Sequence, residues 1–129
     1  MPRVSAAFFA MGVLCVLMGM ALGMHMGATE NMTLAAAHAH LNLVGWVTMA
    51  LYGTFYALTA ATYSVRLAWI NFLISTIGVA VMIPALAMFL TTGRDPQFVP
   101  FMIAGEAITV LGMAVFAISV LRELFRSRA

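Results

Sequence analysis

Residues 38–56 read HAHLNLVGWVTMALYGTFY and occupy the outer two-thirds of an apolar run long enough to cross a bilayer. On a helix that advances about 100° per residue, one broad stripe of this segment holds His38, Asn42, Gly45, Met49, Tyr52 and Tyr56. His40 points nearly the opposite way. Because Gly45 and Gly53 carry no side chain, the stripe is low and predicts a face against which a flat molecule or another helix can lie.

The rest of the chain is also apolar. Of its 129 residues, 64% are hydrophobic and 8% are charged, and the mean hydropathy is +1.06. A soluble domain of this size could not bury so much apolar surface. Four runs reach the roughly 20 residues that cross a bilayer, namely 4–24, 34–63, 67–90 and 98–121. The sequence therefore predicts an all-α integral membrane protein, a four-helix transmembrane bundle with a single domain and antiparallel neighbours.

The arginines predict the orientation of these spans. Five of the six lie before the first run, between the second and third, or after the fourth: Arg3, Arg66, Arg122, Arg126 and Arg128. The positive-inside rule predicts that this side, and with it both termini, faces the cytoplasm, in a bacterial-type inner membrane. The first run is long for a signal peptide, so we expect it to be retained. The net charge of +2 reflects this topology and does not indicate a nucleic-acid partner.

Small residues recur at a four-residue spacing in the first run, at Gly19, Gly23 and Gly27. Such ladders let two helix backbones approach closely in lipid. Two uses are open: packing against the second span of the same chain, or pairing with another copy in a homodimer or higher homo-oligomer. The single Cys15 lies mid-span, where we expect a buried, inert thiol.

The predicted topology brings the ionisable candidates to the outer, periplasmic end of the bundle: His25, His38, His40 and Glu106. A carboxylate inside a membrane usually faces the bundle interior or a polar cavity. Glu106 therefore has three readings, as a protonated hydrogen-bonding group, as a partner that orients a histidine, or as a metal ligand. The flanking methionines of the Met24-His25-Met26 segment would suit copper. The convergence predicts a bound cofactor or metal.

The segment that begins at His38 resembles the second transmembrane helix of subunit I in the heme-copper oxidase superfamily, including its nitric oxide reductase branch. The family has a histidine followed at fixed offsets by Gly-Trp, Met-Ala, Gly and Tyr, and here these are Gly45-Trp46, Met49-Ala50, Gly53 and Tyr56. His40 departs from the family pattern, which has Asn at that position. The resemblance covers about a fifth of the chain.

The resemblance implies that His38 is an axial ligand of a low-spin heme b and that the glycines admit the porphyrin. The later oxidase helices, with the second heme ligand, the copper ligands and the active-site heme, have no counterpart here. The chain is therefore not expected to be a self-sufficient enzyme. The other axial ligand would come from His25, from His40, from a methionine of the first span or from another chain.

Three hypotheses follow for function. The first is a heme b-binding membrane protein of electron transfer or heme-linked sensing, with His38, His25, His40, Gly45, Met49 and Gly53 as cofactor-binding candidates. The second is a periplasm-facing copper or zinc site built from His25, His38, His40 and Glu106. The third is a structural or assembly subunit without a cofactor, in which these side chains form a polar network between helices.

Overall fold

The computed structural model of the protein describes residues 1–126, so Arg128 lies outside the described part. The elements are α1 (Arg3–Thr29), α2 (Ala35–His40), η1 (Leu41–Thr48), α3 (Met49–Leu58), α4 (Val65–Thr91), η2 (Pro96–Phe98) and α5 (Val99–Leu124). Because α2, η1 and α3 run on without interruption, residues 1–126 contain four helices long and apolar enough to cross a membrane. This confirms the all-helical class and the prediction of four helices of membrane-spanning length.

The second span ends at Leu58, earlier than the predicted boundary at residue 63. The chain turns at Thr59, whose carbonyl accepts hydrogen bonds from the backbone N–H groups of Thr62 and Tyr63 at 2.9 Å each. Apolar composition continues through this turn, which is why hydropathy alone overextended the helix.

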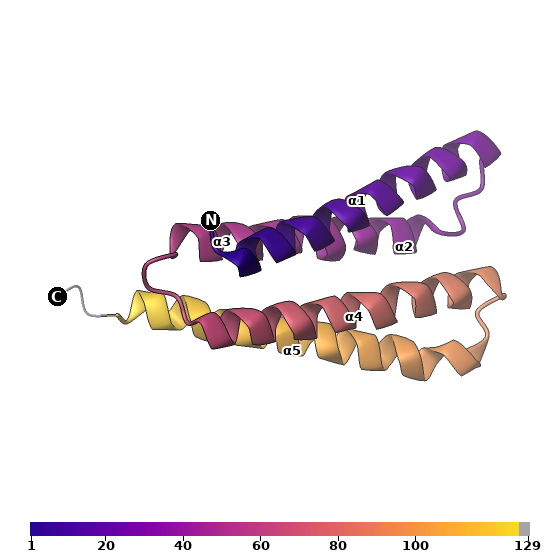
Figure 1. Ribbon diagram of the computed structural model, residues 1–129. Helices are drawn as coiled ribbons and strands as arrows, with labels where there is room; N and C mark the ends of the chain where they lie inside the picture. The colour runs from indigo at the N-terminus through magenta and orange to yellow at the C-terminus, as the bar shows by residue number, and fades with distance from the viewer. Residues whose placement is uncertain (127–129) are drawn as a thin grey trace.

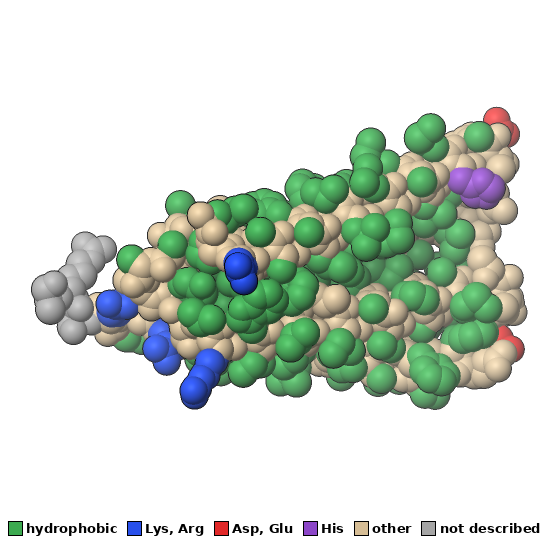
Figure 2. Space-filling model, viewed as in Figure 1, with side chains coloured by type: hydrophobic (Ala, Val, Ile, Leu, Met, Phe, Trp, Pro, Cys, Tyr) green, Lys and Arg blue, Asp and Glu red, His purple; other side chains and the backbone are tan. Residues whose placement is uncertain are grey.

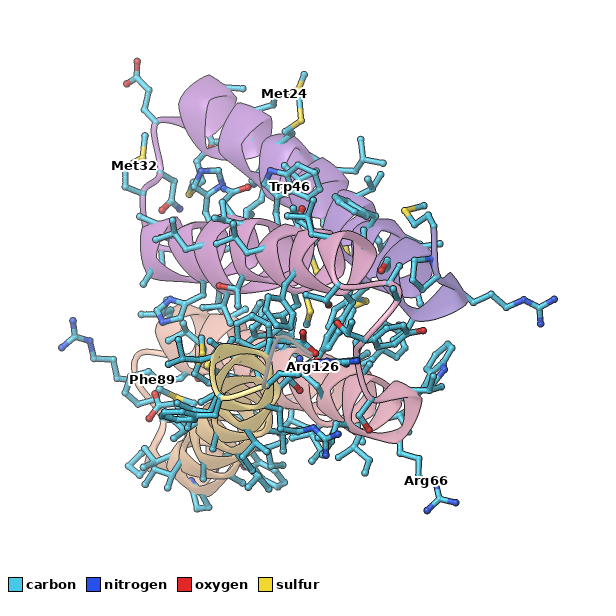
Figure 3. The ribbon with its side chains drawn as sticks, turned by 90° about the vertical axis from the view of Figure 1, so that its left-hand side faces the viewer. Met24, Met32, Trp46, Arg66, Phe89 and Arg126 are labelled. Atoms are coloured by element: carbon cyan, nitrogen blue, oxygen red, sulfur yellow. The ribbon has the colours of Figure 1, made fainter. Side chains whose placement is uncertain are left out.

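The helices are arranged as two antiparallel hairpins (Figure 1). The first consists of α1 and the α2–η1–α3 span, and the second consists of α4 and α5. The start of α1 and the end of α5 lie at one end, here called the arginine end because the blue side chains visible in Figure 2 gather there. The other end is called the histidine end, after His25, His38 and His40. Figure 3, viewed along the bundle, shows the two hairpins as separate layers.

Glycines form the seam of each hairpin. In the first hairpin they lie in both spans, and the pairs are Gly12 with Trp46, Gly19 with Asn42, Gly23 with His38, Gly45 with Cys15, and Gly53 with Phe8. In the second they lie in both helices, and the pairs are Gly78 with Thr109, Gly105 with Met82, and Gly112 with Ser75. Two of the three glycines of the predicted ladder, Gly19 and Gly23, therefore pack against the second span of the same chain. Gly27 has no atom of a neighbouring element within 4 Å of where its Cβ would stand.

The middle of the second span is a π-helix, Leu41–Thr48. In keeping with the wider turn of a π-helix, the Thr48 hydroxyl donates to the Leu43 carbonyl, five residues earlier, at 2.8 Å. The buried positions Ala37, Leu41, Gly45 and Met49 are spaced by four residues. On an α-helix each such step would drift by about 40°, whereas the wider turn keeps them on one face.

The hairpins meet mainly toward the arginine end, around an aromatic cluster. Its rings come from all four spans: Phe8, Tyr52, Tyr56, Phe72 and Phe116. A buried polar network runs through the cluster. Asn71 donates to the Tyr56 hydroxyl at 3.2 Å and accepts from the Ser75 hydroxyl at 3.0 Å, while the Tyr56 and Ser119 hydroxyls lie 3.1 Å apart. The network joins α3, α4 and α5, and sequence reasoning did not identify it.

The substitution Asn71→Leu is expected to destabilise the bundle by about 1 kcal/mol, the usual order for an interhelical polar contact within a membrane. The side chain is fully buried, and its loss leaves the Ser75 hydroxyl without its partner and the Tyr56 hydroxyl with Ser119 alone. Unfolding in mixed micelles, followed by circular dichroism, measures the change. Thr54→Val is the control, because Thr54 is exposed and bonds only to its own helix. An equal loss in both variants would contradict the role of the network.

Candidate functional site

The imidazole of His38 is held between α1 and α2. Its Nδ1 lies 2.8 Å from the carbonyl oxygen of Gly19, and its Cε1 lies 2.9 Å from where a Cβ on Gly23 would stand. A carbonyl can only accept, so Nδ1 carries the proton and donates. The neutral ring then has its lone pair on Nε2, which is the arrangement of a histidine ready to bind a metal through that atom.

Asn42 completes the surroundings of this ring. Its side-chain nitrogen donates to the His38 carbonyl at 3.0 Å. The same nitrogen lies 3.4 Å from Nδ1 and 3.2 Å from Nε2. Because Nδ1 already donates to the Gly19 carbonyl, Nε2 is the ring atom that can accept from this amide. Asn42 therefore braces the ring, and a ligand bond at Nε2 would replace the contact with the Asn42 amide.

The other two histidines do not face His38. The Nδ1 of His40 lies 2.7 Å from the Ala36 carbonyl, so His40 bonds to its own helix. His25 is exposed and lines a pocket with the loop that follows α1. His25, His38 and His40 lie toward the same end of the bundle, as predicted, but within residues 1–126 no three His, Cys, Asp or Glu side chains form a group that could hold a metal ion.

Glu106 also differs from expectation. It was predicted to face the bundle interior, but its side chain is exposed. The reason is the preceding residue: Gly105 packs directly on the backbone of Met82, so the contact face of α5 is centred on Gly105. The next residue is rotated about 100° from that face. Glu106 therefore does not orient a histidine of this chain.

The remaining cofactor candidates are buried by helix packing. Gly45 contacts Cys15, at 2.8 Å from the position of an added Cβ, and Gly53 contacts Phe8 at 3.1 Å. Met49 is 1% exposed in the hydrophobic core. The low stripe below His38 thus packs against α1, and a porphyrin role for these three residues stays a prediction. His38 is the residue of this site whose chemistry fits heme, because its imidazole can coordinate the iron.

Sequence reasoning missed the part of α1 that holds His38. Gly19 supplies the acceptor, and Gly23 supplies the space for the ring. A signal was present, because Gly19 and Gly23 share a four-residue spacing with His38 and Asn42 on an antiparallel neighbour. Matching these spacings would have paired the two helices in this register.

Gly23→Ala is expected to displace the His38 imidazole, because the new Cβ would lie 2.9 Å from Cε1. The hydrogen bond from Nδ1 to Gly19 should then lengthen or break, and the preference for one tautomer should weaken. The ¹⁵N chemical shifts of the labelled imidazole report the tautomer directly. Gly27→Ala is the matched control, because its Cβ would meet open space. Unchanged shifts in Gly23→Ala would contradict the described contact.

Comparisons with protein families, with curated proteins and with solved structures found no match to this chain.

Proposed function

We propose that this protein binds a b-type heme through His38 and transfers electrons in a bacterial-type inner membrane. In this proposal both termini are cytoplasmic, and the histidine end lies at the periplasmic face. The observation that carries the proposal is the hydrogen bond from His38 Nδ1 to the Gly19 carbonyl, at 2.8 Å. It orients the ring and leaves Nε2 as a neutral donor, as an axial heme ligand requires.

A second axial ligand is needed for a low-spin heme. His25 lines a separate pocket and His40 bonds to its own helix, so we assign the second ligand to another copy of the chain. The half-buried ring lies near an exposed apolar surface that includes Met20, Met24 and Leu43. Met24 projects from α1 on the side away from α4 and α5 (Figure 3). A homodimer formed there would cover this surface.

The chemistry that such a heme supplies is one-electron transfer. When two protein side chains hold the iron, no position is left open for a gas or a substrate. The protein's part is to orient His38 and to exclude water with the apolar helices around it. We therefore propose an electron carrier that needs a separate enzyme for catalysis.

The test is an ultraviolet–visible spectrum of the protein purified in detergent, oxidised and then reduced, with metal analysis and the molar mass in solution from the same sample. We expect a sharp Soret band, split bands on reduction and the mass of a dimer. A colourless sample with stoichiometric zinc or copper would overturn the proposal in favour of a metal site. A sample that lacks both, even after heme is supplied during expression, would favour a structural subunit.

A further inference from the structure

A cleft separates the two hairpins toward the histidine end. It has a volume of about 400 Å³ and is lined by apolar side chains of α1, α2, η1 and α4, among them Met18, Leu22, Leu41 and Ile83. Figure 2 shows the opening between the hairpins near the visible histidine. Along α4 the lining runs from Val79 to Ala87, which is a length of about 12 Å. The cleft is therefore elongated along the bundle and suits an apolar chain.

A second, more polar pocket of about 270 Å³ lies at the histidine end. It is lined by His25, Met26, Asn31, Thr33, Leu34 and Thr91. Its position relative to the cleft follows from the helices. Leu34 lines both cavities, and on α4 Ala87 of the cleft lies one helical turn before Thr91 of the pocket. The cavities are thus stacked end to end, with the polar one outermost.

Hydrogen-bond donors are available in the polar pocket. The side-chain oxygen of Asn31 accepts from the backbone N–H of Thr33 at 3.0 Å and from its hydroxyl at 2.6 Å. Within the described chain, the amide nitrogen of Asn31 and the ring nitrogens of His25 have no hydrogen-bond partner. The pocket therefore offers donors to a ligand whose polar atoms are acceptors.

The charges around the pocket favour an uncharged headgroup. No lysine or arginine lines either cavity. The charged residues in the two loops at the same end are Glu30, Arg94 and Asp95, and Figure 2 shows acidic side chains there in red. A phospholipid phosphate would find no cationic partner in the lining of either cavity. Quinone carbonyl oxygens, in contrast, are neutral acceptors that match the amide and imidazole donors.

We propose that the stacked cavities bind an isoprenoid quinone, with its ring in the polar pocket and its chain in the cleft. Asn31 and His25 donate to the ring carbonyls, and the flexible side chains of Met11 and Met18 adapt to the chain. This site uses neither His38 nor heme, so it stands independently of the heme proposal.

The test uses the full chain in quinone-free phosphatidylcholine nanodiscs and radiolabelled decylubiquinone. Empty nanodiscs give the background of partitioning into lipid. We expect saturable binding by the protein above this background. Asn31→Asp removes the donor and keeps the oxygen that accepts from Thr33, and Ala80→Phe fills the cleft. Each is expected to weaken binding about tenfold, or about 1.4 kcal/mol.

Matched controls are available for both changes. Gln97→Glu makes the same amide-to-carboxylate change at the histidine end, and Ala104→Phe adds the same ring on an exposed face of α5, outside both cavities. Both should bind as the wild type does, and so should His38→Ala, which separates this site from heme. No saturable binding, equal binding in all variants, or displacement of the quinone by excess phosphatidylglycerol would overturn the proposal.

Discussion

His38→Ala is expected to abolish the heme absorbance of the purified protein. The substitution removes the only imidazole in residues 1–126 that rests on the glycines of α1, and with it the bond from Nδ1 to the Gly19 carbonyl. Because the alanine side chain has no atom that can coordinate iron, we expect a loss of at least about 100-fold in heme affinity. The absorbance ratio of the Soret band to the protein band, measured after purification with added heme, reports the loss.

Two variants control for this result. His40→Ala removes an imidazole that bonds only to the Ala36 carbonyl of its own helix, and it should keep the full heme content. Glu106→Gln should alter heme binding only modestly, because the carboxylate is exposed and does not face His38. Full heme retention in His38→Ala would remove that residue as the ligand, and release of heme by Glu106→Gln alone would place the carboxylate on the cofactor.

Gly105→Ala is expected to cause the largest loss of stability, about 3 kcal/mol. An added Cβ would lie 2.5 Å from the backbone nitrogen of Met82 and 2.6 Å from its Cα. Backbone atoms cannot rotate away as a side chain can, so α4 and α5 would have to separate. This places the cost at the upper end of the usual range for overpacking. Unfolding in mixed micelles, followed by circular dichroism, gives the change in free energy.

The comparison variant for Gly105→Ala is Gly27→Ala, which makes the same chemical change at a helical glycine with open space around it. There alanine should be neutral or slightly stabilising, because glycine disfavours a helix by about 1 kcal/mol relative to alanine. If both variants unfolded at the same denaturant concentration, the close approach of α4 and α5 at Gly105 would be contradicted.

Hydropathy and length were sufficient to predict the four spans, because crossing a bilayer imposes a minimum run of apolar residues. They were insufficient for the helix geometry. The stripe from His38 to Tyr56 was drawn at about 100° per residue, but Leu41–Thr48 is a π-helix. In the second span, Ala37 and Leu41 are the buried positions nearest the histidine end, and His38 lies at the edge of the buried face.

The direction in which a single polar side chain points from its helix was the least predictable feature. Asn71 pairs with Ser75 one turn later in α4, a spacing that sequence reasoning did not use, and Glu106 has no polar partner of this kind in α5. The structure exposes Glu106, which was expected inside, and buries Asn71, which drew no functional expectation. In both cases the direction is set by contacts across a helix seam, and such contacts are absent from a single segment of sequence. His38 was identifiable because several neighbours at fixed offsets accompany it.

The glycine seams have a consequence for how the chain is assembled. Each hairpin satisfies its own closest backbone contacts, and the two hairpins then dock through the aromatic cluster and the network around Asn71. The connection between them, residues 59–64, carries no seam contact of its own. The two halves are therefore complementary fragments: chains 1–61 and 62–129, inserted separately and expressed together, should reassociate in the bilayer into the intact bundle.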